Sequence, residues 1–138
     1  MGKVIQTEPP AKRRERILRL LSTLLTVMDF SEIGTADFHD QVAFVFLSLW
    51  EIEKSIDETI KSWEKRGYYL KADRFRSEWY WVKDIRSNIE NKIANGQWNL
   101  IEDEIQLLQQ KLSNVKPIKE MKGKRFWVGA YRRFDEVI

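Results

Sequence analysis

The longest regular pattern of apolar residues runs from residue 38 to residue 63. Its apolar positions are separated by alternating steps of four and three residues, and they are Phe38, Val42, Val45, Leu49, Ile52, Ile56 and Trp63. Only Thr59 interrupts the series. Residues at this spacing lie along one side of an α-helix, and so long an apolar side favours packing among other helices over packing on a sheet. The pattern therefore predicts one long amphipathic helix in a helical bundle.

The residues at both ends of this pattern mark where the helix begins and ends. Thr35 and Asp37 are suitable N-caps, and an acidic residue also favours the positive end of the helix dipole. At the other end, Lys65 and Arg66 suit the last turn, and Gly67 is a typical residue after a helix. We predict a helix over residues 35–66, about 45 Å long at a rise of ~1.5 Å per residue.

Three other segments repeat the same spacing, which predicts helices over residues 10–28, 71–94 and 97–115. The loops between the helices are short, and the alternation typical of strands is almost absent. Four amphipathic helices joined by short loops favour an up-down-up-down four-helix bundle. We predict an all-α, single-domain protein over residues 1–138, with a flexible arm over residues 1–9, the helices within residues 10–115 and a basic, aromatic C-terminal extension over residues 116–138.

The second and third helices are longer than the first and fourth, so the hairpin that they form should project beyond its neighbours. Its turn, at Gly67, then lies at the pole where the first helix begins and the fourth ends. The apolar residues left uncovered there are Ile60, Trp63, Tyr68, Tyr69, Leu70 and Phe75. We expect the C-terminal extension to fold onto this end of the hairpin and to complete the core with Phe126, Trp127, Val128, Tyr131 and Phe134.

The same extension supports a second interpretation, because its cations are interleaved with its aromatic residues. These cations are Lys119, Lys122, Lys124, Arg125, Arg132 and Arg133. Cations contact phosphates and aromatic rings stack on bases, so the pattern is also typical of proteins that bind single-stranded nucleic acid. Both interpretations stay open, because one segment can complete a core and still expose its cations.

The formal charge of +3 is distributed unevenly. Residues 1–34 carry six Lys/Arg and four Asp/Glu, residues 35–115 carry eleven and fourteen, and residues 116–138 carry seven and three, which gives +2, −3 and +4. With the extension on the hairpin turn, cations gather at that pole and acidic residues at the other. We predict a charge-polarised bundle, which a basic extension lying beside the Asn95-Gly96 turn would contradict.

Composition excludes several classes of protein. The chain has no cysteine, so it has no disulfide, thiolate nucleophile or cysteine-ligated metal, and we expect a cytoplasmic location. The most apolar stretch near the N-terminus, residues 18–28, is too short to span a bilayer and lacks a small-residue cleavage signal. We therefore expect neither export nor membrane insertion.

Signatures of catalysis and of metal binding are weak. The single histidine, His39, rules out the paired Glu-x-x-His motifs of di-iron bundles, and its acidic neighbours Asp37 and Asp40 are better explained as a polar surface cluster at a helix start. The acidic residues Glu51, Glu53, Asp57 and Glu58 surround the apolar side of their helix, so they are expected to face solvent. The glycines form no phosphate-binding loop. We predict no catalytic residue, no cofactor and no metal site.

Two features of the third helix predict specific contacts. Arg86 lies on its apolar side, and the geometry of the hairpin places it opposite residue 50, where it can stack on Trp50 or pair with Glu51 or Glu53. Tyr80 and Trp81 lie off the apolar side. Either the C-terminal extension covers them, or they belong to a surface that binds a partner or a second copy of the chain.

These observations favour a non-catalytic helical module that binds a protein partner or itself through a basic, aromatic-rich pole. An accessory nucleic-acid-binding subunit that uses the same pole is the second hypothesis. A small-ligand-binding bundle, or an enzyme with an unrecognised site, is the third. The candidate binding surface comprises Arg66, Tyr68, Tyr69, Lys71, Arg74, Arg76, Tyr80, Trp81, Lys124, Arg125, Trp127, Tyr131, Arg132 and Arg133.

Overall fold

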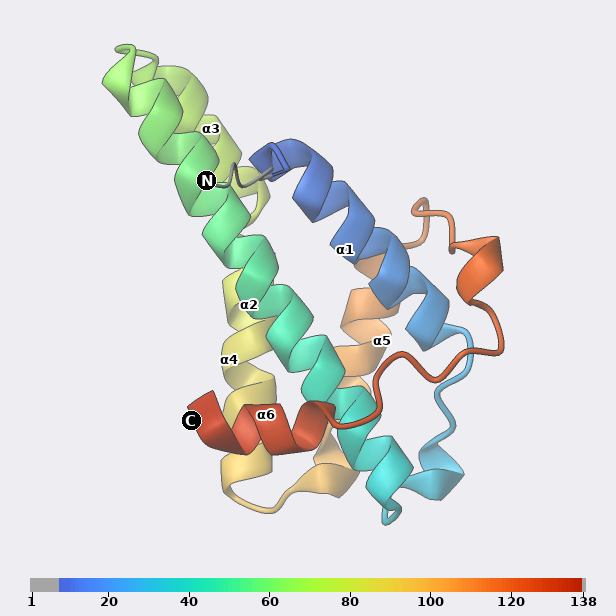
Figure 1. Ribbon diagram of the computed structural model, residues 1–138. Helices are drawn as coiled ribbons and strands as arrows, with labels where there is room; N and C mark the ends of the chain where they lie inside the picture. Colours follow the sequence, from blue (N-terminus) through green and yellow to red (C-terminus); the bar gives the residue numbers. More distant parts are fainter. Residues whose placement is uncertain (1–7, 138) are drawn as a thin grey trace, which may run out of the picture.

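The computed structural model describes residues 8–137, which form six α-helices and three short 3-10 helices and contain no strand (Figure 1). The predicted all-α class is therefore confirmed for this part of the chain. Most of the predicted N-terminal arm, residues 1–7, lies outside the described residues. No helix in the described range is long and apolar enough to cross a membrane.

The long predicted helix is confirmed as α2 (Ala36–Lys65). Thr35 caps it, since its hydroxyl oxygen accepts a hydrogen bond from the Phe38 amide at 3.1 Å. Apart from Trp63, which is half-buried, the predicted apolar positions of α2 lie in the core. Helix α1 (Pro10–Leu25) packs alongside α2 and runs in the opposite direction, as two contacts near its start show. Arg13 reaches Glu58 at 2.7 Å, and Arg14 donates to the Ser55 hydroxyl at 3.2 Å.

The predicted third helix is divided into α3 (Tyr69–Glu78) and α4 (Tyr80–Ala94). The break is at Trp79, whose backbone has φ −107° and ψ 7°, outside the helical region. No glycine or proline marks this position, so the apolar spacing alone predicted an unbroken helix. Below the break, Arg86 pairs with Glu53 of α2 and with Glu90. Of the three predicted partners of Arg86, which were Trp50, Glu51 and Glu53, the structure thus shows a pair with Glu53.

The predicted fourth helix is shorter at both ends. A 3-10 turn, η2 (Trp98–Leu100), precedes α5 (Glu102–Lys111). The Lys92 ammonium donates to the Leu100 carbonyl at 2.7 Å and pairs with the buried carboxylate of Glu104. These two contacts connect the end of α4 to the start of α5. Ile101, just before α5, and Ile105 and Leu108, on its inner side, are fully buried.

The C-terminal extension does not pack on the hairpin turn, so this prediction was wrong. After α5 the chain runs beside α1, where Ser22 donates to the Val115 carbonyl at 2.8 Å and the Ile118 amide donates to Thr23 at 2.8 Å. It passes through η3 (Lys119–Met121) and ends in α6 (Ala130–Val137), which crosses α2 near its start (Figure 1). The extension therefore turns back toward the opposite pole.

Candidate functional site

The clearest candidate site is the end of the hairpin, which we call the hairpin tip and define as residues 61–78. Helices α2 and α3 project here past the start of α1 (Figure 1). After α2, Gly67 adopts a left-handed conformation with φ +82°, and its amide donates to the Glu64 carbonyl at 3.0 Å. The Tyr68 amide donates to the Trp63 carbonyl at 2.9 Å. This turn reverses the chain tightly enough for α3 to pack on α2.

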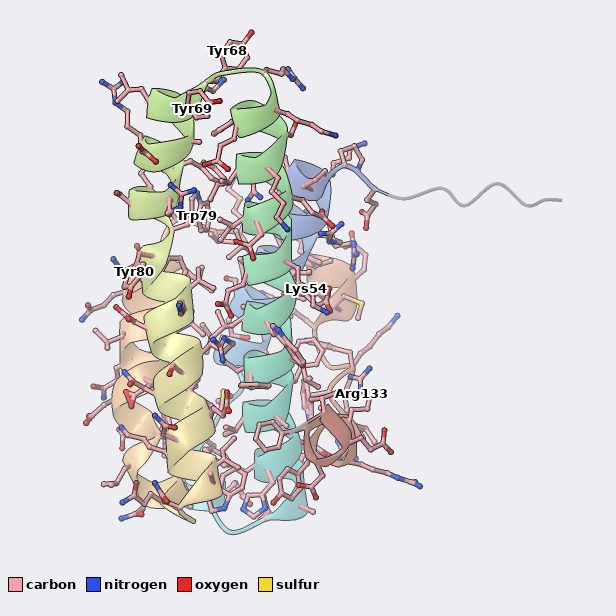
Figure 2. The ribbon with its side chains drawn as sticks, turned by 90° about the vertical axis from the view of Figure 1, so that its left-hand side faces the viewer. Lys54, Tyr68, Tyr69, Trp79, Tyr80 and Arg133 are labelled. Atoms are coloured by element: carbon pink, nitrogen blue, oxygen red, sulfur yellow. The ribbon has the colours of Figure 1, made fainter. Side chains whose placement is uncertain are left out.

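Three consecutive side chains at the turn face solvent. Tyr68 is 50% exposed, Tyr69 64% and Leu70 65%, and Figure 2 shows both tyrosines at the apex. Together with Trp63 and Phe75 they line a hollow of about 620 Å³ at the end of the hairpin. Exposed aromatic and apolar groups gathered in this way are typical of surfaces that bind other molecules.

Half-buried aromatic rings support this exposed group from below. The rings of Trp63 and Phe75 meet edge to face at 5.0 Å, and Phe75 lies 6.1 Å from Trp79. Arg14 of α1 lies over both Phe75 and Trp79, at 5.0 and 5.4 Å. The tip is therefore held on the rest of the protein by aromatic and cation–π packing.

The hairpin tip carries a net positive charge. Residues 61–78 contain six Lys/Arg and three Asp/Glu, a sum of +3 that equals the formal charge of the full chain. The six cations are Lys61, Lys65, Arg66, Lys71, Arg74 and Arg76. The tip is therefore a positively charged segment, as are residues 116–138, which carry +4 and lie elsewhere in the structure.

The cations of the tip have different roles. Arg76 is held by Glu64 at 3.1 Å and Asp73 at 2.6 Å, and hydrogen bonds to these two carboxylates raise its pKa. Lys71 lies 4.5 Å from the centre of the Trp63 ring. Within residues 8–137, Lys71 and Arg74 form no ion pair, and both line the hollow. The charge of Arg76 is therefore already paired, whereas Lys71 and Arg74 retain charge for a ligand.

The tail residues of the predicted binding surface lie elsewhere. Arg125 pairs with Asp37 at 2.6 Å, and the Trp127 indole donates to the same carboxylate at 2.8 Å. The ring centre of Tyr131 lies 5.5 Å from that of Trp98, and Trp98 follows closely on the Asn95-Gly96 turn. Lys124, Arg132 and Arg133 belong to the same returning segment. The charge-polarised arrangement with the tail at the tip was therefore wrong.

The start of α2 explains where the tail goes, and it was missed as a docking site. Partial burial raises the pKa of Asp37, but the hydrogen bonds from Arg125 and Trp127 and the charge of Arg125 outweigh it and hold the pKa below its ordinary value. Asp40 accepts from the backbone amides of Gly129 and Tyr131, at 3.2 and 3.0 Å. The signal in the sequence was two carboxylates at a helix start, which can accept donors from a distant segment.

Two further candidate residues, Tyr80 and Trp81, lie at the start of α4, outside the hairpin tip. Tyr80 is exposed at the first residue of α4 (Figure 2). Trp81 is half-buried, with its ring 5.9 Å from Trp79 and the Lys111 ammonium 5.7 Å above it. Helix α5, and not the C-terminal extension, thus supplies the Lys111 contact to Trp81. Of these two residues, only Tyr80 is exposed enough to belong to a surface that binds a partner.

The residues considered for catalysis and metal binding have structural partners. His39 stacks on Trp98 at 3.8 Å between ring centres and meets Tyr131 edge to face at 5.6 Å. Within residues 8–137 there is no group of three or more histidine, cysteine, aspartate or glutamate side chains placed to hold a metal ion.

Comparison with known proteins identifies no relative. No family model matches the sequence, and searches of curated proteins and of solved structures found no match.

Proposed function

We propose that this protein is a non-catalytic interaction module that binds an acidic segment of a partner protein through the hairpin tip. One observation carries the proposal: Tyr68, Tyr69 and Leu70 are exposed side by side in a segment with a net charge of +3. Aromatic residues and arginines dominate the binding energy of many protein interfaces. A partner that places an apolar side chain in the hollow and carboxylates near Lys71 and Arg74 would match both the shape and the charge of the tip.

A protein partner is favoured over nucleic acid for two reasons. The tail cations, which formed half of the hypothetical nucleic-acid surface, lie at the other pole, and Arg125 is already paired with Asp37. At the tip itself, Glu64, Asp73 and Glu78 are interspersed with the cations, and they would repel a phosphate backbone. Proteins that bind single strands use a continuous positive groove, and the tip is a projection.

The scaffold in this proposal is the predicted four-helix arrangement of α1, α2, the α3–α4 segment and α5. The antiparallel contacts of Arg13 and Arg14 with α2 support it, as does the junction of α4 and α5 at Lys92. In this arrangement α6 is an addition that covers α2. We place the module in the cytoplasm, in keeping with a chain that has no cysteine.

The proposal is tested by comparing two single substitutions at exposed leucines. Full-length protein carrying Leu70→Asp at the tip, or Leu107→Asp on α5 as the matched control, is purified from its native source, and co-purifying proteins are quantified by mass spectrometry. Leu107 is 45% exposed and lies outside the tip. We expect a partner that is retained by the wild type and by Leu107→Asp but depleted at least tenfold by Leu70→Asp. The identified partner should then bind the purified protein less tightly as salt rises.

Three results would overturn the proposal. The first is that no protein distinguishes Leu70→Asp from Leu107→Asp. The second is that nuclease treatment removes the interaction and purified single-stranded RNA binds in its place. The third is that light scattering shows a self-associating wild type and a monomeric Leu70→Asp variant, because the partner would then be a second copy of the chain.

A further inference from the structure

Helix α3 is bounded at both ends by residues outside the helical region of backbone conformation. Before it, Gly67 has φ +82°, and after it, Trp79 has φ −107° and ψ 7°. The Trp79 amide donates to the Phe75 carbonyl in α3, whereas the Trp79 carbonyl accepts from the Val82 amide in α4, both at 3.1 Å. Figure 2 shows Trp79 at this break. Helix α3 is thus a hydrogen-bonded unit separate from α4.

Helix α3 contributes far less to the core than α4 does. Of its ten residues, Ala72 is buried, Phe75 is half-buried and the other eight are exposed. Helix α4 instead buries four apolar residues, which are Val82, Ile85, Ile89 and Ile93. A segment opens at a lower free-energy cost when fewer apolar side chains leave the core with it. Helix α3 is therefore easier to detach from the protein than α4.

The aromatic and polar contacts between α3 and α2 lie near the surface. Phe75 meets Trp63 edge to face at 5.0 Å, and the Lys71 ammonium lies 4.5 Å from the centre of the same Trp63 ring. Arg76 pairs with Glu64, and the two side chains are 47% and 39% exposed. Exposed ion pairs contribute little to stability, because water replaces them at a small cost. These contacts hold α3 in place without fixing it as firmly as a buried interface.

Helix α1 contacts α3 through a buried cation. The guanidinium of Arg14 lies 5.0 Å from the ring centre of Phe75 in α3 and 5.4 Å from that of Trp79 at the break. No carboxylate within residues 8–137 pairs with Arg14. Removal of the Phe75 ring would return water to this cation, which offsets part of the lost cation–π attraction. The contact between Arg14 and Phe75 therefore opposes detachment of α3 only weakly.

We propose that α3 is a lid that detaches from α2 and unfolds locally, between Gly67 and Trp79, while α2 and α4 stay folded. A helix of ten residues is marginal in water, so α3 loses its backbone hydrogen bonds once it leaves α2.

Opening of this lid removes the hollow at the hairpin tip. The hollow is lined by Trp63 of α2 and by residues of α3 that include Lys71, Arg74 and Phe75. A partner that fills it therefore binds the closed position and holds the lid closed. This link to binding rests on the function proposed for the tip. The opening itself does not, and it is measured on the free protein.

The first experiment measures hydrogen–deuterium exchange of the full chain by mass spectrometry, at urea concentrations below the unfolding transition. Amides of residues 72–79 should exchange at least tenfold faster than those of residues 84–94. Exchange in α3 should hardly change with urea, because local opening exposes little surface. Exchange in α4 should accelerate steeply, because it requires unfolding of the core. Equal urea dependence in the two helices would overturn the proposal, since α3 would then open only when the whole protein unfolds.

The second experiment compares exchange in two mild variants, Ile89→Val in α4 and Ala72→Gly in α3. Ile89 is fully buried, and it stays packed when only the lid is open. Ile89→Val should therefore accelerate exchange in α4 about fivefold and leave exchange in α3 within twofold of the wild type.

Ala72→Gly weakens the closed state relative to both the open and the unfolded states. Ala72 is fully buried in α3, and glycine disfavours the helix, so exchange should accelerate about fivefold in α3 and α4 alike. Two results would overturn the proposal. The first is that Ile89→Val accelerates α3 as much as α4, and the second is that Ala72→Gly leaves exchange in α3 unchanged.

Discussion

The two ends of α2 both carry aromatic residues, but one end is covered by another segment of the chain and the other is exposed. Near its start, Phe46 packs edge to face on Phe134 of α6 at 4.9 Å, and Phe38 is fully buried. Near its end, Trp63 is covered only in part, and Tyr69 beyond it is exposed. Both ends combine aromatic and charged residues, but the start carries Asp37 and Asp40 whereas the end is rich in cations. The difference is that a distant segment returns to one end only.

Charge favours the start of α2 over the hairpin tip as the docking site of the C-terminal extension. The extension over residues 116–138 carries +4 and the hairpin tip +3, so contact between them would bring like charges together. The start of α2 instead offers Asp37 and Asp40, which accept hydrogen bonds from Arg125, Trp127 and two backbone amides. Like charge thus disfavours contact between the extension and the tip, whereas the start of α2 offers it acceptors.

The largest expected effect is at the covered end. Phe134→Ala should lower the free energy of unfolding by about 3–5 kcal/mol, because Phe134 is 3% exposed and its removal leaves a cavity against Phe46 or releases α6. Tyr69→Ala at the tip should change it by no more than about 0.5 kcal/mol. Urea unfolding followed by tryptophan fluorescence measures both values. A loss in Tyr69→Ala as large as that in Phe134→Ala would show that the tip contributes to the core.

A smaller effect is expected at the polar contacts that hold the tail. Asp37→Asn should lower the free energy of unfolding by about 1–2 kcal/mol, because it weakens the bonds from Arg125 and Trp127 and removes a negative charge from the first turn of α2. Asp84→Asn is the matched control, since Asp84 is exposed and forms no ion pair within residues 8–137. Equal losses in the two variants would contradict a specific role for Asp37.

Acid should remove the contribution of Asp37. Its pKa in the folded protein lies below its ordinary value, so the folded state favours the carboxylate. The stabilisation is therefore complete above the pKa of about 3.9 in the unfolded chain and is lost as pH falls through the lower folded pKa. The difference in unfolding free energy between wild type and Asp37→Asn should shrink as pH falls below about 4. A difference that stays constant over this range would rule out titration of Asp37 as its source.

Local signals predicted the helices well where they were present. The spacing from Phe38 to Trp63, the Thr35 cap and the Gly67 turn located α2 within a residue at each end. The break at Trp79 had no such signal, because neither glycine nor proline stands there. The 3-10 turn at Trp98–Leu100 replaced the start of the predicted helix over residues 97–115.

The candidate site was predicted in part, and the error came from long-range contacts. The residues of the tip, such as Tyr68 and Lys71, are neighbours along the chain, so a short turn brings them together. The path of the tail depends on contacts across about 90 residues, such as that between Asp37 and Trp127. Helical spacing contains no information on such pairs. A comparison of the charge of residues 61–78, +3, with that of residues 116–138, +4, argues against placing the tail at the tip.

The smallest expected effect is at Arg14, which lies between the two ends of α2. Arg14 is 8% exposed, and burial lowers its pKa, with a further lowering by the charge of Arg13. Its contacts are the Ser55 hydroxyl and the rings of Phe75 and Trp79, and no carboxylate within residues 8–137 pairs with it. Folding thus removes water from this cation without supplying an opposite charge.

Arg14→Met should therefore change the free energy of unfolding by less than about 1 kcal/mol, because the lost cation–π contacts and the relieved desolvation oppose each other. Arg14→Ala is the control for packing, and it should cost about 2 kcal/mol more than Arg14→Met because it leaves space beside Phe75 and Trp79. Urea unfolding of both variants measures the difference. If Arg14→Met is as unstable as Arg14→Ala, the charge of Arg14, and not its volume, connects the hairpin tip to the covered end of the molecule.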